Sequence, residues 1–131
     1  MQRAGVWLLL GLIWFFMGCN RSGQEPAKPS SGFQPGATPT EYAKGEAAFA
    51  RSCQGCHGPM ATGTDRGPSF IHRVYEPSHH GDEAFYRAAR SGVQAHHWSF
   101  GNMPPIQGVT DDDLREIVAY VRWLQRQAGI Q

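Results

Sequence analysis

Cysteine is scarce in this chain, which has only three in 131 residues. Cys53 and Cys56 stand close together, and Cys19 lies far from both near the amino terminus. Small secreted domains often compensate for a small core with several disulfides, and this chain has too few cysteines for such a framework. The folded part must therefore be stabilised by something other than a set of disulfides.

An excess of charge of either sign is also missing. The chain has 12 Lys and Arg against 11 Asp and Glu, a formal net charge of +1 at pH 7. No basic patch suggests a nucleic-acid partner, and the weak net charge predicts limited electrostatic steering toward any partner. The sequence shows no internal repeat, and its length suggests one domain.

No apolar run is long enough to cross a bilayer comfortably. Residues 4–19 are almost wholly apolar, but a helix over them would rise only about 24 Å. This run follows the positively charged Arg3 and predicts a signal peptide for export whose hydrophobic part ends at Gly18 and Cys19. A cysteine there resembles the bacterial lipobox of lipoproteins, although the two residues before the glycine depart from that pattern. An uncleaved short anchor and ordinary cleaved export are the alternatives, and all three place most of the chain outside the cytoplasm.

The composition changes along the chain and predicts three parts. Residues 1–19 form the signal, lipoprotein or anchor segment. Residues 20–39 are rich in Pro, Gly, Ser and Ala, which is typical of a flexible tether and equally of a plain N-terminal extension. Residues 40–131 form the domain, which is small for a chain that must build its own core.

The most informative motif in this domain is a CxxCH run formed by Cys53, Cys56 and His57. Its two thiols lie one helical turn apart and can form thioethers with the two vinyl groups of a haem, while the adjacent imidazole can ligate the iron. A thioredoxin-like redox pair would require a βαβ context that this sequence lacks. The run predicts one covalent haem c attached through Cys53 and Cys56, with His57 as the proximal ligand.

Helical periodicity appears on the N-terminal side of this run. A helix is expected from near Thr40 to the haem site, because Tyr42, Gly45 and Phe49 are spaced by three and four residues and share one face. Glycine inside a helix costs about 1 kcal/mol relative to alanine. A glycine on the buried face therefore implies that another element approaches it closely.

The last helix has the clearest signals at both ends. Thr110 is expected as N-cap with Asp113 closing a capping box, and Gly129 as C-cap. Arg122 and Arg126 lie toward the negative end of the helix dipole. The apolar face is expected to consist of Leu114, Ile117, Val118, Tyr120, Val121, Trp123 and Leu124.

These motifs, in this order, resemble the small class I c-type cytochromes. In that family the N-terminal helix crosses the C-terminal helix, and here Gly45 and Phe49 would meet Ile117 and Tyr120. The resemblance covers about residues 40–127. It implies an all-α cytochrome c fold, with three to four short helices and loops wrapped around one covalently bound haem.

The resemblance also implies residues around the iron. Met103, in a Gly-Asn-Met-Pro-Pro context, would be the second axial ligand, and Met/His ligation raises the haem potential relative to two nitrogen ligands; a core methionine is the alternative. The carbonyl of Pro68 would accept a hydrogen bond from Nδ1–H of His57 and fix that ring. A further helix over residues 82–92, with Gly92 at its C-cap, would precede the methionine loop.

Histidines exceed what such a carrier needs. The six in the chain include five besides His57, namely His72, His79, His80, His96 and His97. They are either loop residues that contact the haem propionates, or ligands of a separate metal, since imidazole suits copper and zinc. In a third interpretation His96 or His97 competes with Met103 for the iron. Three other side chains are candidates for hydrogen bonds to the propionates, namely Arg73, Tyr75 and Trp98.

Together these features predict a monomeric single-haem electron carrier and not an enzyme, since two axial ligands leave no vacancy for a substrate. Expected partners are membrane redox proteins, an oxidase or a quinol-oxidising complex. The expected location is the bacterial periplasm or the outer face of the cytoplasmic membrane, with attachment through a lipidated Cys19 or an N-terminal anchor. One alternative is a haem protein with a labile sixth ligand that reduces peroxide or binds gases. The other is a cytochrome with an added His-rich copper site.

Overall fold

The computed structural model describes residues 32–131. The predicted export segment over residues 1–19, its Cys19 and most of the predicted tether over residues 20–39 lie outside the described residues. Within residues 32–131, none of the helices combines the length and the apolar character that a membrane crossing requires.

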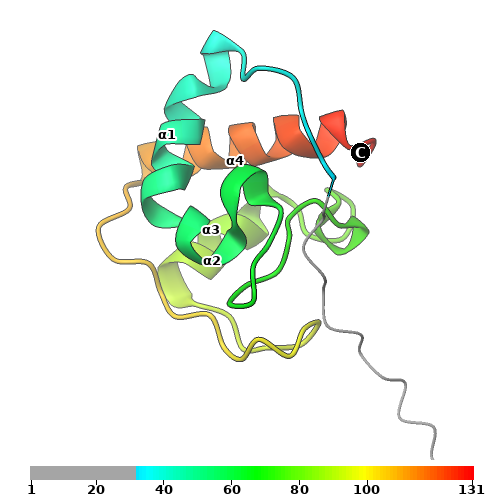
Figure 1. Ribbon diagram of the computed structural model, residues 1–131. Coiled ribbons are helices and arrows are strands. Elements are labelled where there is room, and N and C mark those ends of the chain that lie inside the picture. Colours follow the sequence, from blue (N-terminus) through cyan, green and yellow to red (C-terminus); the bar gives the residue numbers. More distant parts are fainter. Residues whose placement is uncertain (1–31) are drawn as a thin grey trace, which may run out of the picture.

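The described chain consists of helices joined by loops, as the all-α prediction requires. Four are α-helices and three are 3-10 turns. In chain order they are η1 (Thr40–Tyr42), α1 (Ala43–Ser52), α2 (Gln54–His57), η2 (Pro59–Ala61), η3 (Arg73–Tyr75), α3 (Asp82–Ser91) and α4 (Asp111–Gln127). Figure 1 shows α1 running across α4, so the predicted contact between the N- and C-terminal helices is confirmed.

A glycine lies where the two terminal helices cross. Gly45 is buried in α1, and a Cβ built on it would overlap the backbone oxygen of Glu116 and lie 2.8 Å from the Cβ of Tyr120. One turn later Phe49 is 1% exposed, and its ring centroid lies 5.8 Å from that of Tyr120. The close approach predicted from the glycine is therefore the contact between the α1 and α4 backbones.

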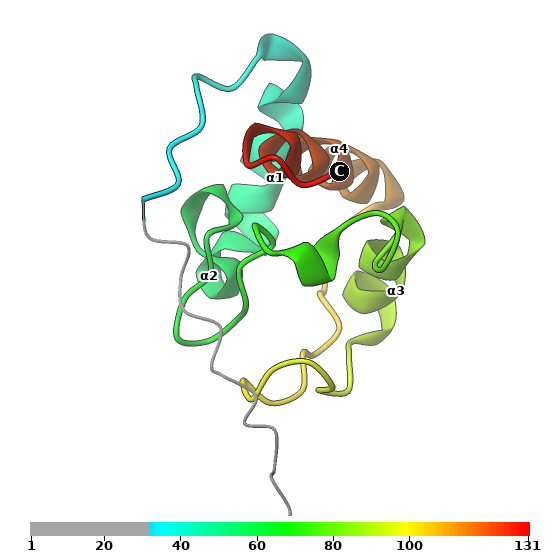
Figure 2. The same ribbon diagram turned by 90° about the vertical axis from the view of Figure 1, so that its right-hand side faces the viewer.

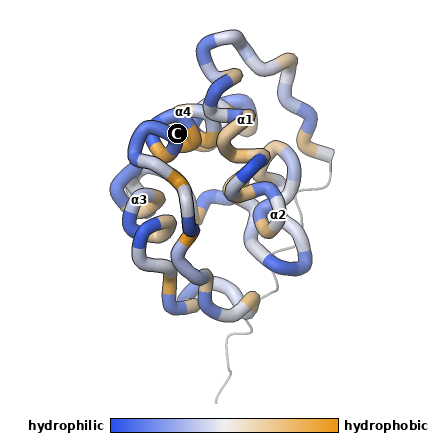
Figure 3. Tube along the Cα trace, turned by 90° about the vertical axis from the view of Figure 1, so that its left-hand side faces the viewer, coloured by the Kyte–Doolittle hydropathy of each residue, from blue (hydrophilic) through white to orange (hydrophobic). Residues whose placement is uncertain are grey.

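The core surrounds this crossing. Every residue of the apolar face predicted for α4 is buried. Figure 3 shows hydrophobic residues along α4 and mainly hydrophilic residues along the outer loops. The main core cluster consists of Ala48, Phe49, Ala61, Phe70, Ile117, Tyr120, Val121, Trp123 and Leu124.

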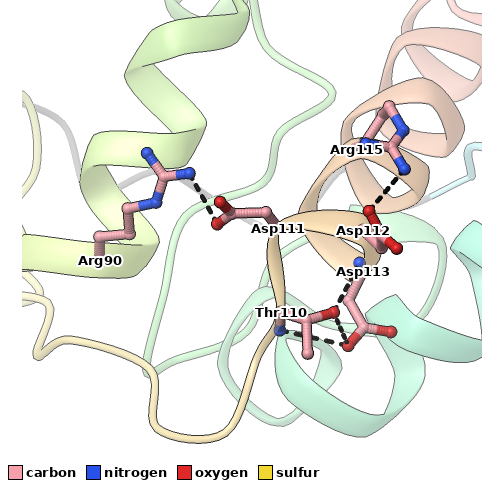
Figure 4. Close-up of polar contacts among 6 residues, drawn as sticks. All are labelled: Arg90, Thr110, Asp111, Asp112, Asp113 and Arg115. Carbon is pink, nitrogen blue, oxygen red and sulfur yellow. Dashed lines mark hydrogen bonds and ion pairs between the residues drawn. The ribbon is translucent and has the colours of Figure 1, made fainter.

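The capping box predicted at the start of α4 is present (Figure 4). Thr110 Oγ1 accepts a hydrogen bond from the backbone N of Asp113 at 3.1 Å, and the Asp113 carboxylate accepts one from the backbone N of Thr110 at 3.2 Å. These bonds satisfy donors that the first turn of a helix leaves without intrahelical partners. They fix the residue at which α4 begins and so the register of its apolar face.

Loss of this cap should have a measurable cost. Thr110→Ala should lower the free energy of unfolding by about 1 kcal/mol, read from guanidinium unfolding of the haem-loaded protein. Asp112→Asn is the control, because Asp112 forms an exposed pair with Arg115 at 2.7 Å, and its loss should change stability by less than about 0.5 kcal/mol. Equal losses in both variants would contradict the role of the box.

At its other end α4 stops one residue earlier than predicted. The C-cap is Ala128, and Gly129 follows it with a φ of +75°. Ile130 N donates to the carbonyl of Gln125 at 2.9 Å, and Gly129 N donates to that of Arg126 at 3.1 Å. This is the Schellman arrangement, in which the glycine lies just beyond the C-cap because that position needs left-handed backbone.

The helix predicted over residues 82–92 is also present. It is α3, and Gly92 is its C-cap with a φ of +76°. A Cβ at Gly92 would lie 2.5 Å from the carbonyl oxygen of Met103, so the glycine permits two chain segments to approach each other. Directly after it, Val93 and Met103 form an isolated antiparallel bridge. The end of α3 and the methionine loop are thereby joined.

Candidate functional site

The junction of α1 and α2 holds the CxxCH residues. Cys53 N donates to the carbonyl of Phe49 at 2.8 Å, so the hydrogen-bond pattern of α1 continues into the motif. His57 N donates in turn to the carbonyl of Cys53 at 3.0 Å. Both thiols are free, with Cys53 half-buried and Cys56 exposed. Burial, reinforced by the neighbouring Cys56, raises the pKa of Cys53 to about 11.

The imidazole of His57 is buried and oriented by the backbone. Its Nδ1 lies 2.9 Å from the carbonyl oxygen of Pro68, so Nδ1–H donates and Nε2 is left as the nitrogen for a ligand. Burial lowers the pKa of His57, and the bond to Pro68 partly opposes that shift. The ring also stacks on Phe70, with centroids 4.1 Å apart. The roles of His57 and Pro68 toward a haem remain predictions.

The loop that carries Pro68 is folded back onto the motif. A Cβ at Gly67 would lie 2.9 Å from the carbonyl oxygen of Cys56, so the two backbones are in close contact. Thr64 Oγ1 donates to that same carbonyl at 2.5 Å, and the guanidinium of Arg66 donates to the carbonyl of Gly55. These contacts fix the position of the Pro68 carbonyl relative to the His57 ring.

Met103 lies in the loop between α3 and α4. Its backbone exchanges two hydrogen bonds with Val93, at 2.9 and 3.0 Å, and its side chain is half-buried. The neighbouring Asn102 accepts a bond from the backbone N of Ala95 at 2.9 Å. Figure 2 shows this yellow loop passing below α3, on the far side of the fold from the α1–α4 crossing. Iron ligation by Met103 remains a prediction.

Two of the three predicted propionate contacts lie together. Trp98 Nε1 donates to the hydroxyl of Tyr75 at 3.0 Å. Burial raises the pKa of Tyr75 to about 12, although the bond from Trp98 opposes that shift. The Arg73 side chain is 88% exposed, and its Nε lies 4.0 Å from the Glu76 carboxylate. Arg73 lies in the same turn, η3, as Tyr75, and any contact of the three side chains with a propionate remains a prediction.

The two histidine pairs that flank α3 meet in space. His79 Nε2 lies 3.3 Å from His97 Nε2, and the rings of His80 and His97 have centroids 5.1 Å apart. His96 packs on His97 with centroids 4.3 Å apart. Burial lowers the pKa values of His80 and His97; the hydrogen bond to the Val74 carbonyl partly opposes the shift of His80, and the positive charges of neighbouring groups lower both values further. The fifth histidine, His72, instead contacts Trp98 edge-on at 4.9 Å. The sequence showed two adjacent pairs around one helix but did not predict their contact.

Arg122 makes contacts that the sequence did not predict. The sequence placed it toward the C-terminal end of the helix dipole, yet its side chain is only 10% exposed. Its guanidinium donates to the Asp82 carboxylate at 2.7 Å and to the carbonyls of Tyr75 at 2.7 Å and His80 at 2.6 Å. It also donates to the side-chain oxygen of Gln125 at 2.7 Å. The signal in the sequence was its position four residues after Val118, beside the apolar face of α4.

The cytochrome c family model matches residues 42–125. The chain belongs to the cytochrome c family. No curated protein and no solved structure matches it. Cytochromes c are typically electron carriers rather than enzymes. The side chains of this cytochrome c fit a covalently attached haem c, because two free thiols lie one helical turn apart beside an imidazole whose Nδ1 is already bonded.

Proposed function

We propose that this cytochrome c is a single-haem electron carrier with His57 and Met103 as the axial ligands. The observation that carries the proposal is the 2.9 Å contact between His57 Nδ1 and the Pro68 carbonyl, which directs Nε2 to serve as the ligand. Second-shell bonds of this kind fix the tautomer and orientation of a ligating histidine. When bound, haem c supplies the one-electron couple between ferrous and ferric iron.

Each residue of the site has a separate task in this proposal. Cys53 and Cys56 hold the group covalently, so it is retained through every redox cycle. Pro68 orients His57 through its carbonyl. Met103 supplies a soft, neutral thioether, which raises the potential relative to a second imidazole. Support for Met103 comes from the paired backbone bonds with Val93, which restrain the residue that must present the sulfur.

We also propose an exported, membrane-anchored setting. Cytochrome c domains are usually located outside the cytoplasm. The apolar run over residues 4–19 and the Cys19 that ends it support export and a lipid anchor on the periplasmic face of a bacterial membrane. Anchoring confines the search for partners to a surface and favours membrane redox proteins such as an oxidase or a quinol-oxidising complex.

The optical spectrum of the purified haem-loaded protein tests the ligand assignment. The ferric wild type should show the weak far-red sulfur-to-iron band, and Met103→Ala should lose that band, become high-spin and have a lower reduction potential. Met60→Ala is the matched control, since Met60 lies only three residues after His57 in η2 and should keep the band. A wild type without the band, or a Met103→Ala spectrum like that of the wild type, would assign the sixth position to another group or leave it open.

A further inference from the structure

Three histidines from two separate segments bring ring nitrogens together away from the CxxCH motif. His79 and His80 follow η3, whereas His97 lies beyond α3 in the loop that carries Met103. One ring nitrogen from each of the three lies within 4.8 Å of the other two. His79 is exposed and the other two are half-buried, so the group is open to ions from solvent.

The closest pair already has the spacing of two ligands on one ion. His79 Nε2 and His97 Nε2 are 3.3 Å apart. Two nitrogens held about 2.0–2.1 Å from one tetrahedral Zn²⁺ are separated by about 3.3–3.4 Å. Nitrogens at right angles around Cu²⁺ at about 2.0 Å would be only about 2.8 Å apart, so the spacing favours tetrahedral over square-planar geometry. A simple hydrogen bond would explain one pair of nitrogens, but it would not explain the convergence of a third imidazole.

His80 has the backbone partner expected of a metal ligand. Its Nδ1 lies 2.6 Å from the carbonyl oxygen of Val74, so Nδ1–H donates and Nε2 keeps a lone pair. Ligating histidines commonly donate their second nitrogen to a carbonyl in this way, which fixes both tautomer and ring orientation. The Arg122 guanidinium binds the His80 carbonyl and is paired with the Asp82 carboxylate. That pairing offsets the positive charge that would otherwise repel a cation.

We propose that His79, His80 and His97 form a site for one Zn²⁺ ion, separate from the haem ligands. Three neutral imidazoles suit zinc, and a water molecule completes the tetrahedron. His96 is left out of the ligand set, because the ring nitrogens that converge within 4.8 Å of one another belong to His79, His80 and His97. The bound ion would join the turn after η3 to the loop that carries Met103.

The test uses the full haem-loaded protein, produced without a polyhistidine tag, stripped with a chelator and desalted. Zn²⁺ is then titrated by isothermal calorimetry. We expect one ion per chain, with affinity at least about tenfold weaker in His79→Ala and in His97→Ala. Two matched controls should bind as the wild type does. His96→Gln removes the ring that packs on His97. In His72→Asn the replacement side chain can still accept the hydrogen bond from Val74 N.

The melting temperature is a second measurement, which also applies to variants whose stability has changed. Excess Zn²⁺ should raise the melting temperature of the wild type and leave that of the His79→Ala/His97→Ala double variant unchanged, because an ion stabilises only the state that binds it. Saturable binding that persists in the double variant, or is lost equally in His96→Gln and His72→Asn, would overturn the ligand set. Cu²⁺ binding with the same residue dependence but without Zn²⁺ binding would overturn the choice of ion. The far-red band is recorded on the same samples, and Met103→Ala should still bind Zn²⁺. Failure of the zinc proposal can therefore be distinguished from failure of the electron-carrier proposal.

Discussion

Gly45→Ala should lower the free energy of unfolding by about 3 kcal/mol, and Gly45→Val by more. The added Cβ would overlap the Glu116 carbonyl oxygen and lie 2.8 Å from both the Glu116 carbonyl carbon and Tyr120 Cβ. The first two of these atoms belong to the α4 backbone, which cannot move aside as the end of a flexible side chain can. Helix propensity alone predicts the opposite sign, since alanine is favoured over glycine by about 1 kcal/mol within a helix. The sign of the change therefore separates close helix packing from local preference.

Guanidinium unfolding of the haem-loaded protein measures this effect. Gly36→Ala is the control for the chemical change, because Gly36 is exposed and has nothing within 4 Å of a built Cβ. It should change stability by less than about 0.5 kcal/mol. Because α1 runs directly into Cys53, a displaced α1 should also lower the yield of protein with attached haem. A Gly45→Ala protein as stable as the wild type would mean that α1 and α4 do not meet at this glycine.

Features that depend on neighbouring residues could be predicted from the sequence. The capping box of Thr110 and Asp113 is contained in four consecutive residues, and the burial of α4 follows from its apolar period. Boundaries were less exact. The chain enters the first helix through the 3-10 turn Thr40–Tyr42, and the C-cap of α4 is Ala128 rather than Gly129. Such shifts of a residue or more arise because helix ends are set by a few competing hydrogen bonds.

The candidate site, like the fold, could be predicted only where its residues are close in the sequence. Cys53, Cys56 and His57 form a contiguous motif whose chemistry can be read directly, whereas Pro68 and Met103 were inferred from the resemblance to class I cytochromes c. The histidine cluster was not predicted as a cluster, because His79 and His97 are 18 residues apart with α3 between them. The role of Arg122 was missed for the same reason, since its partners in the chain are up to 47 residues away. Only tertiary packing brings these groups together.

Arg122→Met should cost about 3 kcal/mol of unfolding free energy, although methionine fits the apolar face of α4. The His80 carbonyl would lose the guanidinium donor that now lies 2.6 Å away, and the Tyr75 carbonyl would keep only its 3.1 Å bond from Gln125. The substitution also removes the guanidinium that lies 5.0 Å from the Phe85 ring centroid. Leaving a buried acceptor without its donor costs about 1–3 kcal/mol.

Two control variants separate charge from hydrogen-bond geometry. Asp82→Asn should cost less than about 1 kcal/mol, because the Asp82 side chain is 61% exposed and water replaces much of the pair. Arg122→Lys keeps the charge but not the planar fork that reaches several acceptors at once, so its loss should fall between the other two. If the ion pair alone mattered, Arg122→Met and Asp82→Asn would lose similar amounts of stability, and Arg122→Lys, which keeps the charge, would lose little. Because Arg122 also holds the backbone of His80, Arg122→Met should weaken Zn²⁺ binding while Asp82→Asn leaves it close to wild type. That outcome would show that α4, the helix that crosses α1, also supports the histidine cluster through Arg122.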